Sequence, residues 1–326
     1  MPSHETVTAS PAAAPVRVRR LPRPPTRLHA LSKKVATKVA ALAVLTLGVW
    51  LGLCPDARAG DVLEPGSFWP PNVELTRASG MGGAHSAIVT GNDAIVLNPA
   101  GLSQTKRYHF QADGAFDSRF PGQGISLSIV DSSSSAAGTG MLFQRWGAGS
   151  PGGRGEGWLA GLGYSYFAGN FFFGGTTRYL RFQNGKLGEV HQFVQDFGLL
   201  LKTSELSWSL VTRNLSTTTT SLFPPTSTLG VAFGSDADYH LAVDYTTNFD
   251  DFNNLKHKLA AGGELFFDRT LVFRAGYTWD VSAHLGSVSA GLSLVTEKLG
   301  LHFAWRRRLS GPLDQYFEGG LTVYLE

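Results

Sequence analysis

Seven ionisable side chains stand at alternating positions of otherwise apolar segments in the second half of the chain: Arg178, Asp196, Asp244, Glu264, Arg274, His302 and Arg306. Successive side chains of an extended strand point to opposite sides, so this spacing places these groups together on one face. A charged face inside a closed structure can bind a ligand, or it can hold another part of the chain through paired polar contacts. Both interpretations are open, and the second is preferred because a sealed interior needs paired polar groups.

Linear motifs for catalysis or metal binding are absent from the sequence. The nine histidines are scattered without His-x-His spacing, and the single cysteine is Cys54. No Gly-x-Ser-x-Gly elbow occurs, and the glycines at 80–83 lack the preceding strand and the following lysine of a phosphate loop. Residues on a barrel wall could still act without a linear motif, but we predict no enzyme, no catalytic residues, no metal and no cofactor. The Arg306-Arg307-Arg308 cluster ends a strand, so we predict no nucleic-acid partner.

The elements that carry these side chains are about fourteen segments of roughly ten residues with alternating apolar and polar positions, from Tyr108 to Leu325. Five connections are tight: Ala168-Gly169, Lys202 to Glu205, Ser235 to Asp238, Asp268-Arg269 and Glu297-Lys298. The alternate connections are longer and loop-like: Gly147 to Gly157, Leu215 to Ser227, Asn248 to His257, Asp280 to His284 and Arg308 to Asp314. Short periplasmic turns with longer external loops are typical of outer-membrane barrels.

The sequence therefore predicts an all-β protein, an antiparallel transmembrane β-barrel of about fourteen strands. An arginine facing lipid at mid-depth costs about 2–4 kcal/mol, so the charged face must be the interior. A secreted β-sandwich or propeller would also accommodate the aromatic residues, but it would not need the regular alternation of short and long connections.

The first 59 residues differ in composition from the rest. The chain has 28 Lys and Arg against 25 Asp and Glu, and the first 59 residues contain 9 of the basic and 2 of the acidic ones, which leaves 19 against 23. Basic residues precede an apolar run from Val39 to Leu53 and an Ala57-Arg58-Ala59 site, which predicts a secretory signal at 1–59. An uncleaved anchor is the alternative, and the long basic region before the run allows a start downstream of Met1. We assign 60–106 to a periplasmic or plug segment and 107–326 to the barrel.

A segment rich in small residues precedes the first strand and contains Gly82-Gly83-Ala84, Asn92-Asp93-Ala94 and Asn98-Pro99-Ala100-Gly101-Leu102. Together with Gly262-Gly263-Glu264 and Arg274-Ala275-Gly276-Tyr277, it resembles the FadL-like long-chain fatty-acid transporters and their PorV/PorQ-like relatives. The resemblance implies a short helical plug in the barrel, with Gly82, Gly83, Asn98, Pro99 and Gly101 as its motif residues. Asn98 to Leu102 could instead only position the first strand. Pro99 fixes its own φ and keeps Asn98 out of the helical region, while Gly101 permits a left-handed or tight conformation.

The resemblance implies an integral protein of the bacterial outer membrane that contacts membrane lipid and is inserted by the barrel-assembly machinery. The first function it implies is passive transport of hydrophobic, fatty-acid-like small molecules. The second is a PorV-like barrel that binds secreted or surface proteins. A closed barrel without transport is a third possibility. The last strand, from Phe317 to Leu325, fits an insertion signal except that the chain ends on Glu326 instead of an aromatic residue.

Overall fold

The computed structural model describes residues 60–61, 75–117, 122–184, 188–215, 224–249, 251–268, 270–309 and 315–325. The predicted signal at 1–59 lies outside the described residues. In the described part of the chain, no helix has the length and apolar character needed to cross a membrane.

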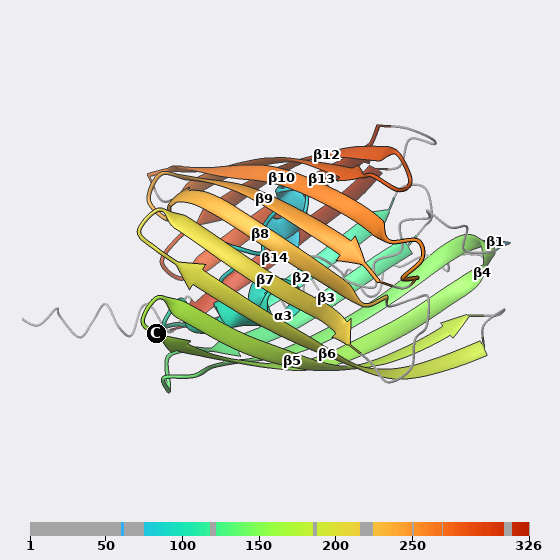
Figure 1. Ribbon diagram of the computed structural model, residues 1–326, viewed down its shortest axis with the longest axis horizontal. Coiled ribbons are helices and arrows are strands. Elements are labelled where there is room, and N and C mark those ends of the chain that lie inside the picture. Colours follow the sequence, from blue (N-terminus) through green and yellow to red (C-terminus); the bar gives the residue numbers. More distant parts are fainter. Residues whose placement is uncertain are drawn as a thin grey trace, which may run out of the picture. The chain divides into compact units, whose positions relative to one another are not determined.

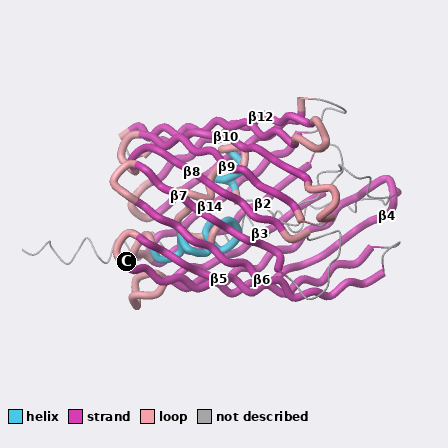
Figure 2. The backbone as a smooth tube through the Cα atoms, in the orientation of Figure 1, coloured by secondary structure: helices cyan, strands magenta, loops and turns pink. Residues whose placement is uncertain are grey.

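A closed antiparallel β-barrel forms the wall, and its strands surround the few helical turns (Figures 1 and 2). The strands after the N-terminal segment are β2 (Tyr108–Asp117), β3 (Gly122–Asp131), β4 (Gly138–Ala168), β5 (Phe171–Asn184), β6 (Gly188–Lys202), β7 (Leu206–Leu215), β8 (Thr226–Ser235), β9 (Tyr239–Asn248), β10 (Lys256–Phe267), β11 (Leu271–Asp280), β12 (Leu285–Val295), β13 (Leu299–Arg308) and β14 (Gln315–Leu325). Each pairs with its neighbours in sequence, and β14 pairs with β2 to close the ring. Closure leaves no strand edge facing lipid, as a membrane-spanning sheet requires.

The long element β4 supplies two strands of the wall. Its residues 139–147 pair with β3 and its residues 155–168 pair with β5, both antiparallel. A Cβ atom placed on Gly157 would lie 2.9 Å from Trp146 Cζ2, so the chain turns back within the element. Counted this way, the described wall from β2 to β14 has fourteen strands, which confirms the predicted fold. The expected loop from Gly147 to Gly157 is wrong, since this stretch continues as strand; β1 (Gly60–Asp61) pairs with it in parallel.

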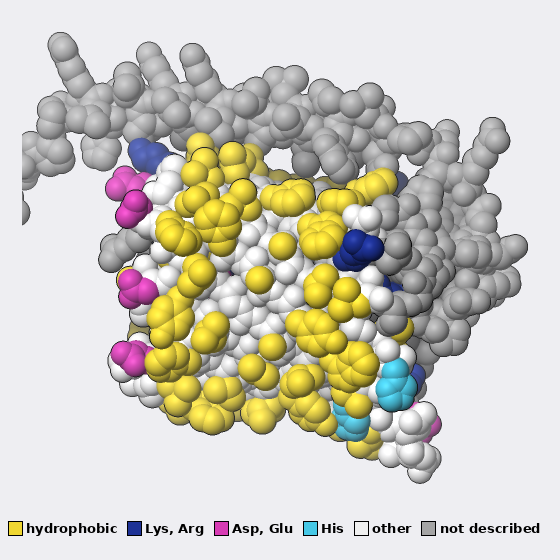
Figure 3. Space-filling model, turned by 90° about the horizontal axis from the view of Figure 1, so that it is seen from above, with side chains coloured by type: hydrophobic (Ala, Val, Ile, Leu, Met, Phe, Trp, Pro, Cys, Tyr) yellow, Lys and Arg dark blue, Asp and Glu magenta, His cyan; other side chains and the backbone are white. Residues whose placement is uncertain are grey.

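The alternation of side chains produces the two faces of the wall. In β9 the burial alternates residue by residue, with Leu241, Val243 and Tyr245 exposed and His240 and Asp244 buried. Large apolar side chains form a belt on the outside, and acidic side chains gather at the end of the barrel with the short turns (Figure 3). An apolar belt suits contact with lipid. Because charge facing lipid is costly, charged groups are favoured at the ends and in the interior of the barrel.

The interior is filled by the N-terminal segment, which contains α2 (Thr76–Gly80), α3 (Asp93–Leu97) and the 3-10 turn η1 (Pro99–Ser103). Nearly all residues of 75–103 are buried. We call 75–104 the plug. It packs on two apolar clusters, and the larger one joins Ile95 and Leu102 to Leu142, Leu159 and Leu180 on β4 and β5.

Candidate functional site

The local conformation of the plug follows from its motif residues. Asn98 is extended, with φ −156° and ψ 100°, and its Oδ1 accepts a hydrogen bond from Ala100 N at 3.1 Å, which caps the η1 turn that begins at Pro99. Gly82 and Gly83 have φ of +68° and +82°, a region that favours glycine. Gly101 does not have positive φ; a Cβ there would lie 2.8 Å from Val89 Cγ1, so it is needed for a close approach.

The wall is shaped to receive this backbone. Inward-facing glycines lie where the plug touches the strands: Gly174 and Gly198 against Pro99 and Asn98, and Gly262 and Gly276 against Met81. Thr278 Oγ1 donates to Gly82 O at 2.5 Å, and Ser165 Oγ donates to Ala100 O at 2.9 Å. Because these wall glycines have no side chain, the plug backbone comes close enough to form hydrogen bonds with neighbouring wall side chains.

The strongest electrostatic contact of the plug is with Glu264 on β10. Arg77 Nη2 lies 2.5 Å from Glu264 Oε1, and Arg77 Nε donates to Glu264 Oε2 at 3.2 Å. The same carboxylate accepts a hydrogen bond from Arg274 Nε at 3.0 Å and lies 3.0 Å from His240 Nδ1. Burial disfavours the charged form of Arg77, but the Glu264 carboxylate outweighs this and raises the arginine pKa. A plug cation is thus held by a wall carboxylate that is 1% exposed.

A second anchor uses Asp244 on β9. Its Oδ2 accepts hydrogen bonds from the backbone N–H groups of His85 and Ser86 at 3.1 and 2.9 Å, and its Oδ1 accepts from Ser86 Oγ at 2.8 Å. Within the plug, Asn98 Nδ2 donates to the Ser86 backbone oxygen at 2.9 Å, which ties the two halves of the plug together. Asp113 on β2 accepts from Thr76 Oγ1 at 2.7 Å.

The plug also contains a buried ionisable pair. His85 Nδ1 lies 3.8 Å from Asp93 Oδ2, and within the described residues neither ring nitrogen of His85 has a hydrogen-bond partner. Burial raises the pKa of Asp93 to about 7, with Arg77 opposing the rise, and burial together with Arg77 holds the pKa of His85 well below its usual range. His85 is therefore neutral, and the charge of Asp93 changes near neutral pH.

The structure divides the seven predicted interior residues into groups. Glu264, Arg274 and Asp244 lie on the adjacent strands β9 to β11, on one side of the plug. Arg178 and Asp196 pair with each other at 2.7 Å and are each 1% exposed, and Arg178 also donates to Asn214 Oδ1 at 2.8 Å. These two lie on β5 and β6, away from the Glu264 cluster.

The remaining two predicted residues lie on β13. His302 lies between Ser293 and Thr322 of the neighbouring strands, 2.8 and 2.9 Å from their hydroxyl oxygens. Arg306 stands on the same inward face, half-buried. Arg178, Asp196 and His302 therefore each pair with side chains of neighbouring wall strands. In the described part of the chain, no cluster of three metal-ligating side chains occurs.

Sequence reasoning missed Arg77 and His240. Arg77 is the sole Lys or Arg between Leu75 and Gln104, and such an isolated cation in a segment of small apolar residues was a usable signal. His240 follows a tight turn, and nothing in its local sequence distinguishes it from an exposed histidine.

Solved structures share this architecture. CymD, a monoaromatic hydrocarbon channel, has a TM-score of 0.63 at 13% identity, and the match covers 78% of this chain and 99% of that chain. TbuX, the toluene transporter of Ralstonia pickettii, has a TM-score of 0.59 at 12% identity, with 78% and 98% covered. A FadL homologue of Pseudomonas aeruginosa has 0.60 at 11%, with 76% and 98% covered.

The barrel has the FadL-like fold. No family model and no curated protein matches the sequence. At identities this low the likeness concerns the fold, and the FadL-like architecture agrees with the resemblance drawn from Asn98 to Leu102 and the glycine-rich segment before it.

Proposed function

We propose that the protein is a passive channel of the bacterial outer membrane for small hydrophobic molecules, without a cofactor or catalysis. The observation that carries the proposal is a closed barrel of FadL-like fold whose interior is occupied by a folded plug. The solved structures of similar fold are described as a monoaromatic hydrocarbon channel and a toluene transporter.

The interior supports an apolar cargo. On the β3 to β5 side, the inward face carries Val130, Leu142, Trp146, Leu159 and Leu180, all buried in the cluster that packs on the plug. An apolar molecule that enters between this face and the plug exchanges one set of apolar contacts for another, which costs little free energy. A charged solute would gain nothing there and would lose its hydration.

The test is uptake across an intact outer membrane, because pure phospholipid bilayers are already permeable to apolar molecules. A Gram-negative strain without its own hydrocarbon channels would express the full chain, and initial uptake of radiolabelled toluene would be compared with the empty strain. We expect faster uptake. A gel shift on boiling would show that the closed barrel is present, and unchanged uptake despite that shift would contradict the proposal. A protein that co-purifies stably with the barrel would favour the PorV-like function instead.

A further inference from the structure

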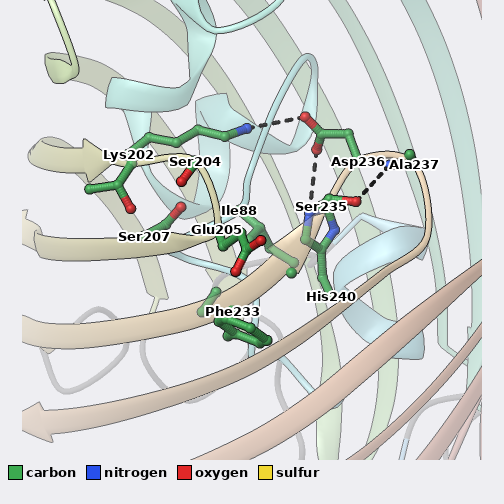
Figure 4. Close-up of a pocket in the computed structure, with 13 residues that line it drawn as sticks. Ile88, Lys202, Ser204, Glu205, Ser207, Phe233, Ser235, Asp236, Ala237 and His240 are labelled. Atoms are coloured by element: carbon green, nitrogen blue, oxygen red, sulfur yellow. Dashed lines mark hydrogen bonds and ion pairs between the residues drawn. The ribbon is translucent and has the colours of Figure 1, made fainter.

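A pocket of about 280 Å³ opens at the end of the barrel that carries the short turns (Figure 4). Its rim is formed by the turn between β6 and β7 and the turn between β8 and β9. Its inner lining combines Ile88 of the plug with Ser207, Ala232 and His240 of the wall, which are all buried. The pocket therefore touches both the plug and the periplasmic side of the barrel.

Three charged or ionisable groups of the pocket, Lys202, Asp236 and His240, are already paired. Lys202 Nζ lies 3.2 Å from Asp236 Oδ2, His240 Nε2 lies 3.4 Å from Asp236 Oδ1, and His240 Nδ1 lies 3.0 Å from Glu264. Glu205 stands exposed at the mouth. An anionic ligand would have to take Lys202 from Asp236 and would meet the Glu205 carboxylate, whereas an uncharged ligand can use the surfaces of Ile88 and Ala232 without breaking a pair. The chemistry of the pocket thus favours an uncharged molecule over an anion.

The volume restricts the size of that molecule. An apolar cavity of about 150 Å³ is enough to bind benzene, and sites for larger, drug-sized ligands begin near 300 Å³. A pocket of about 280 Å³ therefore fits a molecule of one or two rings. An extended long acyl chain would not fit.

An apolar seam leads from the pocket into the barrel. The plug residues Met81, Ala84, Ala87 and Ile88 form one buried cluster with three alanines on neighbouring strands, Ala232 on β8, Ala242 on β9 and Ala260 on β10. Alanine side chains make few contacts, so separating these surfaces costs less than separating large side chains. The seam also runs between the two polar anchors, Asp244 with Ser86 and Glu264 with Arg77, which can stay in place on either side.

We propose that this pocket is the periplasmic exit site of the channel: it holds an uncharged molecule of one or two rings that arrives along the seam between the plug and β8 to β10. The proposal rests on the proposed function, since it names the last binding site on that transport route. Occupancy of the pocket requires no displacement of the whole plug, because Ile88 already forms its inner wall.

Binding is tested by thiol protection in the purified full chain with Cys54→Ser, which removes the sole native cysteine. Ala232→Cys places a thiol in the pocket, and Ala168→Cys at the exposed end of β4 is the matched control. We expect naphthalene to slow alkylation of Ala232→Cys by about tenfold at a concentration about ten times its Kd. Alkylation of Ala168→Cys should not change. Absence of protection, or equal protection by 2-naphthalenesulfonate, would overturn the assignment.

The exit role is tested by filling the pocket in cells. Ala232→Phe should reduce toluene uptake to the level of the empty strain, while Ala168→Phe should leave it unchanged and both should keep the gel shift. Normal uptake by Ala232→Phe overturns the exit role even if naphthalene protects the cysteine. If the unmodified protein shows no uptake but Ala232→Cys is protected, the transport function fails and the binding site stands.

Discussion

Replacing Glu264 by Gln should release the plug while leaving the barrel closed. The carboxylate neutralises Arg77 of the plug and Arg274 of the wall and also contacts His240. A glutamine keeps the shape but leaves two arginines without their counter-charge in a site that is 1% exposed. Strand β10, which carries Glu264, is held by ten backbone pairings with β9 and ten with β11. None of these pairings depends on the Glu264 side chain.

The magnitude follows from the cost of breaking a buried ion pair on one side, about 3–5 kcal/mol. Since about 1.4 kcal/mol corresponds to a factor of ten, the population of displaced plug should rise by roughly two to three and a half orders of magnitude. Arg77→Gln should have a smaller effect, because Glu264 keeps Arg274 and His240. In the double variant with both Glu264→Gln and Arg77→Gln, the plug no longer carries an uncompensated charge. The effect of the double variant should therefore be less than the sum of the two single effects.

The assay is ion conductance of the purified protein in planar bilayers, with hydrogen exchange of the plug amides as the second readout. A displaced plug leaves a lumen lined by polar side chains of β9 to β14, so Glu264→Gln should conduct and the unmodified protein should not. Glu189→Gln removes an exposed carboxylate on β6 that pairs with Arg181, and it serves as the control. A silent Glu264→Gln with unchanged amide protection would refute the view that this cluster holds the plug.

Three further outcomes follow from the plug contacts. Gly262→Val should displace Met81 and lower the free energy of unfolding by about 1–3 kcal/mol. Gly319→Ala should leave this free energy unchanged, because an added Cβ there meets nothing within 4 Å. Asn98→Ala should lower the free energy of plug opening measured by hydrogen exchange by about 0.5–2 kcal/mol, as for other lost caps. The seated plug raises the pKa of Asp93 from 3.8 to about 7, so ionisation should weaken seating as pH rises through that interval. In Asp93→Asn this contribution to the pH dependence should disappear; an unchanged profile would contradict it.

The wall was predictable because the alternation of apolar and polar residues follows directly from its two environments. Lipid outside and polar groups inside force a period of two, and strands such as β9 and β11 show it in the sequence. The continuation of β4 through 147–157 was missed because Ser150-Pro151-Gly152-Gly153 has low strand propensity, which is typical of a loop. The two halves of β4 continue the ladders with β3 and β5, and this long-range pairing overrides the local preference.

The site was predictable only in part. That Glu264 and Arg274 lie together follows from their places on adjacent strands, since they are direct partners in the register of β10 and β11. Their contact with Arg77 depends on where a short helix lies in the barrel, and no periodicity encodes that position. Likewise, the positive φ of Gly82 and the close approach of Gly101 to Val89 require the tertiary structure, although both residues stood out in the sequence.

The plug is attached to the two sides of the barrel by different forces, and this difference suits a channel for apolar cargo. Toward β9, β10 and β11 it is held by charge-assisted bonds from Asp244 and Glu264, which are directional and are not replaced by an apolar molecule. Toward β3, β4 and β5 it is held largely by apolar packing around Ile95 and Leu102, for which such a molecule can substitute. Hydrophobic cargo can therefore replace the apolar contacts of the plug, both on β3 to β5 and along the alanine seam of β8 to β10, while the Asp244 and Glu264 anchors remain in place. Ions and water make no such substitution, which supports the proposed selectivity for apolar molecules over the polar solutes that a porin passes.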